Sequence, residues 1–99
     1  MRFGGKHYIN LIFSNFLRKE WMIMERLIEI LEGIEAGVDY ENCNTLIDDG
    51  YLDSLAIISL IAEIEEEFDV QIPTVEIVPE NFNSAEAIWE LIKRIEEEG

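Results

Sequence analysis

The sequence predicts an all-α bundle of three long helices and one short helix, with a long loop between the first two helices. Apolar residues recur at the spacing of one helix face in three stretches, residues 22–36, 54–68 and 84–95. The only prolines, Pro73 and Pro79, lie between the second and third stretches and leave no room there for another long helix. Ninety-nine residues with 48% hydrophobic content suit one domain with one core.

The first predicted helix covers residues 22–36, and Gly37 is suited to end it. Its core positions are Met24, Leu27, Ile28, Leu31 and Ile34. The loop of residues 38–53 is long enough that we expect it to be functional or fixed to the core. Its expected inward anchors are Val38, Leu46, Ile47 and Leu52. Tyr51 either borders Ser54 or packs within the loop, and we favour packing.

A turn and a cap precede the second helix. Asp48, Asp49 and Gly50 combine short acidic side chains with a glycine, which is typical of a turn. Asp53 is the predicted N-cap, whose carboxylate accepts an N–H of the first turn, so Ser54 takes the first helical position with its hydroxyl in solvent. The amides and the positive end of the helix dipole favour an anion there, by roughly 0.3–1 kcal/mol when exposed. A phosphodiester on Ser54 would be well accommodated.

The second helix has two apolar faces when successive residues are placed about 100° apart. The core face holds Ile57, Leu60, Ile61, Ile64 and Phe68. A second face, beside Ser54, holds Leu55, Ile58 and Ala62. Because one core does not need this much apolar surface, the second face predicts a docking surface for a partner. The alternative is that residues 1–21 or a loop cover it.

The chain after the second helix is predicted to be extended and then helical again. Residues 70–73 are extended because Pro73 disfavours helix before it, and Pro79 limits residues 75–82 to a short helical turn. Asn83 is the predicted N-cap of the last helix, with Glu86 three residues on at the spacing of a capping box. The core face of this helix holds Ile88, Leu91, Ile92 and Ile95.

Charge divides the chain at residues 21 and 22. Residues 1–21 hold four basic residues against one acidic residue, a charge of +3, whereas residues 22–99 hold three against 21, a charge of −18. The total of −15 excludes a nucleic-acid backbone as partner, because that binding needs clustered Lys and Arg. Proteins with a basic docking patch are the expected partners. We therefore divide the chain into an N-terminal extension, residues 1–21, and a domain, residues 22–99.

The extension is apolar, aromatic and basic. It is too short and too interrupted by Asn10, Ser14 and Asn15 to span a membrane, and it lacks the long apolar region of a signal peptide. We expect a cytoplasmic protein without stable membrane insertion. Three interpretations stay open: an extra helix packed on the bundle, an amphipathic membrane-surface segment, or translated upstream sequence before a natural start at Met22 or Met24. We favour the first or the third.

Other site chemistries fit the sequence poorly. A calcium loop centred on Gly50 would have a suitable ligand only at Asp49. His7 is the only histidine and Cys43 the only cysteine, so neither a metal cluster nor a disulfide is expected. Ser54 lacks the G-x-S-x-G frame of a hydrolase, and there is no glycine-rich phosphate loop. We expect a protein that is not an enzyme and binds no metal.

The motifs around the second helix form a connected pattern. Its parts are Asp53-Ser54-Leu55, Glu65-Glu66-Glu67-Phe68, Ile72-Pro73 and a last helix that starts through Asn83 and Ser84. This pattern, which runs from about Met24 to Ile95, resembles the acyl carrier protein family. The resemblance implies a four-helix bundle that carries 4'-phosphopantetheine, supplied by coenzyme A, on Ser54, with an acyl or aminoacyl group held as a thioester. It also implies that Asp53 helps a phosphopantetheinyl transferase to engage.

The resemblance implies further partners, namely the enzymes that load and accept the acyl or aminoacyl group. The predicted docking residues are Leu55, Ile58, Ala62, Asp49, Glu65 and Glu66. Ala56 and Ser59 are neutral where carriers of fatty acid biosynthesis tend to be acidic. The chain is therefore more similar to D-alanyl carriers and to stand-alone carriers of peptide, polyketide or other specialised pathways. We expect a monomer, and the alternative from another class is an unmodified interaction module.

Overall fold

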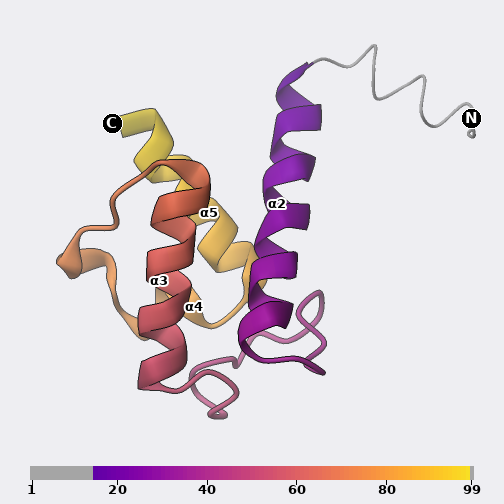
Figure 1. The fold of residues 1–99 in the computed structure, drawn as a ribbon, viewed down its shortest axis with the longest axis vertical. Coiled ribbons are helices and arrows are strands. Elements are labelled where there is room, and N and C mark those ends of the chain that lie inside the picture. The colour runs from indigo at the N-terminus through magenta and orange to yellow at the C-terminus, as the bar shows by residue number, and fades with distance from the viewer. Residues whose placement is uncertain (1–14, 99) are drawn as a thin grey trace, which may run out of the picture.

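The computed structural model describes residues 15–98, with side chains from Trp21 onward. The helices are α2 (Asn15–Ile34), α3 (Ser54–Phe68), α4 (Pro79–Phe82) and α5 (Ala85–Glu98), and a 3-10 turn, Thr74–Glu76, lies between α3 and α4 (Figure 1). No strand occurs in this described range. The predicted all-α fold of three long helices and one short helix is confirmed, and the short elements fall where Pro79 was expected to place them.

The first helix is longer at its N-terminal end than the sequence predicts. α2 begins at Asn15 rather than Met22 and ends at Ile34, so it runs through the predicted boundary between residues 21 and 22. Residues 15–21 contain no proline or glycine that would interrupt a helix. The division of the chain into an extension and a domain stays a prediction, and residues 1–14 lie outside the described residues.

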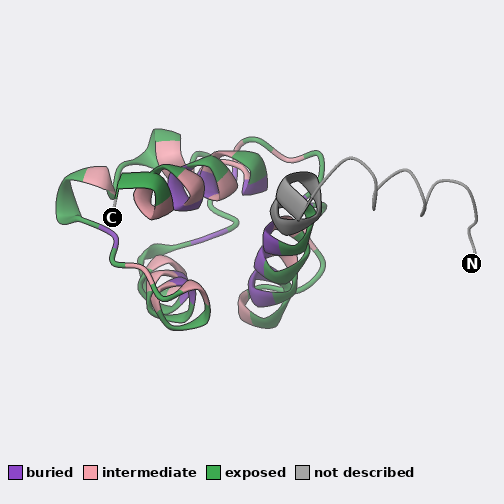
Figure 2. Ribbon diagram, turned by 90° about the horizontal axis from the view of Figure 1, so that it is seen from above, coloured by how far each residue is buried: buried purple, intermediate pink, exposed green. Residues whose placement is uncertain are grey.

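The three long helices enclose one core. α2 packs against α3 and α5, and α4 packs against α5. Figure 2 shows the buried residues turned toward the space between these helices. The most deeply buried side chains are Leu27, Leu31, Leu46, Leu60, Ile64, Phe82, Ile88, Leu91 and Ile92. All but Phe82 were predicted to face inward. The other predicted core residues of the helices are partly buried and pack against this cluster.

One basic residue links α2 to α3 at the surface. The Arg26 guanidinium donates to Glu67, with Nη2 2.9 Å from Oε1, and also pairs with Glu29 on its own helix. The hydrogen bond from Arg26 lowers the pKa of the Glu67 carboxyl. Because these side chains are exposed, this link contributes little to the stability of the fold.

The loop after α2 is fixed to the core as predicted. Leu46 and Leu52 are buried, and Val38 and Ile47 are partly buried against the core. Tyr40, which the sequence did not single out, is also buried, at 3% exposure. Its hydroxyl donates to the carbonyl oxygens of Leu31, at 3.2 Å, and of Glu35. The Leu31 carbonyl also accepts the Glu35 N–H at 2.8 Å, so the Tyr40 hydroxyl is a second donor to it and fixes the loop to the end of α2.

The start of α5 differs from the prediction. Ser84, not Asn83, supplies the cap: its Oγ accepts the Ala87 N–H at 3.0 Å, and Ala85 is the first helical residue. The predicted capping box from Asn83 to Glu86 is therefore wrong. Asn83 is used elsewhere, because its side chain turns to the loop before α3.

Within the described residues no helix is both long enough and apolar enough to cross a membrane.

Candidate functional site

The start of α3 has the predicted geometry. Asp53 is extended, with φ −90° and ψ −174°, and its Oδ1 accepts the Ala56 N–H at 2.8 Å. The Asp53 carbonyl also accepts the Ile57 N–H at 2.9 Å, which closes the first helical turn. The prediction that Asp53 caps the helix is confirmed. Gly50, in the preceding turn, adopts φ +78°, a conformation that favours glycine.

Ser54 is the first residue of α3 and is exposed to solvent. Its position at the helix start favours a negative charge on the hydroxyl oxygen, because the remaining first-turn amides and the helix dipole point toward it. The Asp53 carboxylate already accepts one of those amides. The site thus offers one accessible nucleophilic hydroxyl in a position suited to a phosphate.

The apolar face beside Ser54 is open among the described residues. Leu55 is 75% exposed, Ile58 is 64% exposed, and Ala62 is exposed as well. The loop of residues 38–53 leaves them exposed, so it does not cover this face. The alternative that residues 1–21 cover it concerns residues 1–14 and side chains of residues 15–20, which lie outside the described ones. We name Leu55, Ile58 and Ala62 the apolar patch.

The acidic residues predicted to flank the site differ in what they contact. Asp49 is exposed, and its Oδ2 accepts the Thr45 hydroxyl at 2.7 Å. Glu65 is half-buried, and its Oε2 accepts the Ile72 N–H at 3.0 Å. Glu66 is exposed on α3. Glu65 thus has a role in holding the extended segment after α3.

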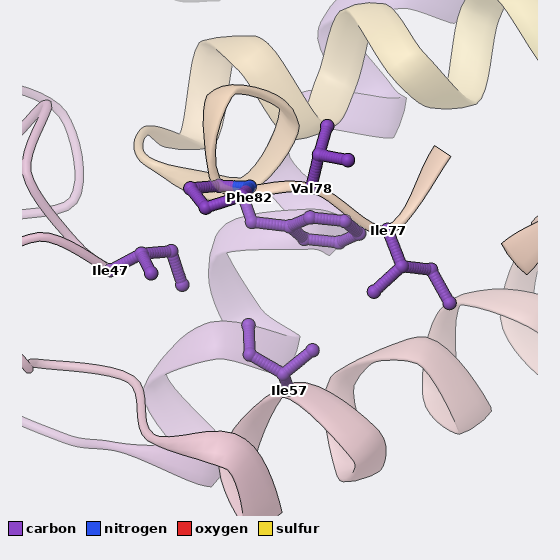
Figure 3. A pocket seen from close by; sticks show the side chains of 6 residues that line it. Ile47, Ile57, Ile77, Val78 and Phe82 are labelled. Carbon is purple, nitrogen blue, oxygen red and sulfur yellow. The ribbon is translucent and has the colours of Figure 1, made fainter. Parts of the chain in front are cut away.

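A cavity of about 150 Å³ lies between α3, the loop, α4 and the segment just before α4. It is lined by Ile47, Ile57, Ile77, Val78, Pro79 and Phe82. Figure 3 shows the Phe82 ring among the lining side chains, with Ile57 pointing toward the ring from α3 and Ile47 from the loop. Ile57 is three residues after Ser54 on the same helix, so the cavity lies beside the first turns of α3, close to Ser54. All six lining residues are apolar.

The region around Ser54 matches known proteins. Residues 44–92 match the phosphopantetheine attachment site family. Over 66 residues the chain is 39% identical to the D-alanyl carrier protein of Listeria monocytogenes serotype 4b (strain CLIP80459), covering 65% of this chain and 85% of that protein. The chain belongs to the phosphopantetheine-binding acyl carrier protein family. This carrier is also 34% identical, over 74 residues, to aminoacyl carrier protein 1 of Bradyrhizobium diazoefficiens, covering 71% of this chain and 81% of that protein.

The prosthetic group of the family fits the site that the carrier presents. Members of this family carry groups on 4'-phosphopantetheine and are not enzymes. An exposed hydroxyl at a helix start can be reached by a transferase, and the position favours the phosphate that attachment would place there.

Two residues near the site were not assigned correctly from the sequence. Tyr51 is 47% exposed, so our interpretation of it as a packed loop aromatic is wrong. Asn83 lies far from Ser54 in sequence, yet it hydrogen-bonds the loop that leads to the site. An asparagine before a helix predicts a cap, and nothing in the local pattern reveals a partner 35 residues away.

Metal and disulfide chemistry have no support in the described part of the carrier. No group of three or more His, Cys, Asp or Glu side chains there could hold a metal ion. Cys43 is a free, half-buried thiol whose Sγ lies 3.6 Å from the Thr45 hydroxyl. His7 lies outside the described residues.

Proposed function

We propose that Ser54 is the residue of this carrier that bears 4'-phosphopantetheine, and that the arm holds an aminoacyl group as a thioester for delivery to partner enzymes. The observation that carries this proposal is the exposed Ser54 hydroxyl at the first position of α3, directly after the Asp53 cap. When it is attached, 4'-phosphopantetheine supplies the thiol that forms the thioester with the aminoacyl group.

The residues around Ser54 favour its modification. The Ser54 oxygen would bond to the pantetheine phosphate of coenzyme A and form a phosphodiester as the pyrophosphate bond breaks. The nucleotide part would leave with the other phosphate, and the hydroxyl proton would pass to a base of the transferase. The helix start stabilises the resulting negative charge. Asp53 fixes the first turn and is the proposed point at which a phosphopantetheinyl transferase engages. No other chemistry is required of this chain.

The cargo proposal rests on two observations. The relatives named above include a D-alanyl and an aminoacyl carrier protein. In addition, Ala56 and Ser59 leave the early part of α3 without carboxylates. The second candidate is a short apolar acyl group, which the apolar cavity beside Ile57 favours because it provides no partner for an ammonium group.

We propose that partners dock on the apolar patch and on its acidic flanks. Asp49 and Glu66 are exposed and supply charge for a basic partner surface. Glu65 adds charge while it holds the Ile72 N–H. The partners would be the transferase and the enzymes that load and accept the cargo. We propose that the carrier acts as a monomer in the cytoplasm.

The proposal is tested by intact-mass spectrometry after incubation with coenzyme A and a broad-specificity phosphopantetheinyl transferase. We expect wild type to gain one phosphopantetheine, mapped to Ser54, and Ser54→Ala to gain none while keeping its helical circular dichroism. Ser59→Ala, which removes another exposed serine of α3, is the matched control and should load fully. An unchanged mass on folded wild type would instead favour the unmodified interaction module.

A further inference from the structure

Asn83 makes an unusual set of contacts between the α4–α5 junction and the loop before α3. Its Oδ1 accepts the N–H groups of Ile47, at 2.9 Å, and of Asp48, at 3.1 Å. Its Nδ2 donates to Asp48 Oδ2 at 3.2 Å, and its carbonyl accepts the Leu46 N–H at 2.9 Å. One residue thus satisfies three consecutive backbone amides 35 to 37 positions earlier in the chain.

These contacts continue toward the serine through the loop itself. The Asp49 N–H donates to the carbonyl oxygen of Thr45, and the Gly50 N–H donates to the carbonyl oxygen of Ile47 at 3.0 Å. The Leu52 N–H donates to the Leu46 carbonyl at 2.9 Å, and both leucine side chains are buried. Asp53 and Ser54 follow directly. Asn83 therefore helps to fix the conformation of a hydrogen-bonded loop that leads directly to the start of α3.

The same residue joins two walls of the cavity. Ile47, whose N–H is held by Asn83, lines one side, and Phe82, the residue before Asn83, lines another (Figure 3). Loss of the Asn83 side chain would release the Ile47 wall from the Phe82 side. It would leave two amides to find water or other acceptors.

We propose that Asn83 is a positioning residue for the modification of Ser54: it holds residues 46–48 so that the turn before α3 is ordered when the transferase binds. This inference rests on the proposed function of Ser54. A loop that is already ordered loses no further conformational freedom when the transferase binds. If only a fraction of the molecules have the ordered loop, the apparent affinity for the transferase falls in proportion to that fraction. The effect belongs in KM rather than in kcat.

The test compares Asn83→Ala with Asn42→Ala in the full chain. The control removes a side-chain hydrogen bond of the same kind in the same loop, from Asn42 Nδ2 to Asp39 Oδ2 at 3.0 Å. With coenzyme A and the transferase, far below the melting temperature, we expect Asn83→Ala to raise KM about tenfold with kcat unchanged. Asn42→Ala should keep the wild-type KM. Equal KM values for the two variants would overturn the proposal.

A reversed pair tests whether the side-chain contact between residues 83 and 48, and not merely the change at residue 83, sets KM. Asn83→Asp keeps the acceptor for Ile47 and Asp48 but sets a carboxylate against the Asp48 carboxylate. Adding Asp48→Asn restores a donor and acceptor pair with the direction reversed. We expect Asn83→Asp to raise KM and the double variant to return it to the value of Asp48→Asn alone. A double variant that stays as impaired as Asn83→Asp would contradict the proposal.

Hydrogen exchange distinguishes failure of this inference from failure of the carrier assignment. The amides of Ile47 and Asp48 should exchange faster in Asn83→Ala than in Asn42→Ala, whether or not the protein can be modified. If wild type is not modified, the assignment of Ser54 fails, whatever the exchange rates. If wild type is modified but exchange and KM do not change in Asn83→Ala, only the role of Asn83 fails.

Discussion

At the residue scale, Tyr40 fixes the end of α2, and its hydroxyl is the group to test. Burial, followed by the charges of Glu32, Glu35 and Cys43, raises its pKa from 10.0 to about 12. Tyr40→Phe leaves the Leu31 and Glu35 carbonyls without this donor, so we expect it to lower the free energy of unfolding near neutral pH by about 1 kcal/mol. Urea unfolding measures this difference.

The pH dependence of that difference has a definite sign. Because the folded pKa is raised, the protonated hydroxyl stabilises the fold fully below pH 10.0, and this contribution is lost as the pH rises through about 12. The free-energy gap between wild type and Tyr40→Phe should shrink over this window. Tyr51→Phe, at a side chain that is 47% exposed, is the control and should change little. A gap that persists at alkaline pH would contradict the assignment.

Single residues could be predicted from sequence where their contacts are local. Asp53 contacts an amide three positions away, so the cap and the place of Ser54 followed from the pattern around them. Asn83 and Tyr40 could not be predicted in the same way. Their partners are set by how the loop folds back on α2 and on the α4–α5 junction, which no local spacing records.

At the element scale, α3 has a core face and an exposed apolar patch. Ile58 is 64% exposed, so Ile58→Glu should leave the melting temperature nearly unchanged. If the patch docks the transferase, the added charge should lower kcat/KM for modification of Ser54 about tenfold, or about 1.4 kcal/mol. Ser59→Glu adds the same charge one residue along α3 and should have a smaller effect. Equal kcat/KM values for both variants would argue against docking on the patch.

The elements themselves were mostly predictable, and their ends were not. Strong apolar periodicity identified the three long helices, and Pro79 located the short one. The early start of α2 at Asn15 was missed because the charge change after residue 21 suggested a boundary, whereas the helix continues through that point. Charge and helical continuity respond to different forces, so one does not locate the other.

At the scale of the whole molecule, the fold and the carrier class followed from the sequence, whereas the cavity did not. Its walls come from α3, the loop, α4 and the segment just before α4, which the sequence separates by up to 35 residues. Apolar residues in these segments could all have been counted as core. Only their arrangement shows that Ile47, Ile57 and Phe82 leave a space of about 150 Å³ between them.

The net charge of −15 makes the stability of the molecule depend on salt. Seven basic residues cannot pair 22 acidic ones, so the folded chain repels itself, and this repulsion is screened over about 8 Å at physiological ionic strength against about 30 Å at 0.01 M. We expect NaCl to raise the melting temperature by about 4–8 °C for each 1 kcal/mol of repulsion relieved, and MgCl₂ to act at lower concentration. Replacing the exposed Glu63 and Glu66 with Gln should raise the melting temperature in low salt and reduce the further gain from NaCl. A melting temperature that is indifferent to ionic strength in both proteins would mean that self-repulsion does not limit this fold.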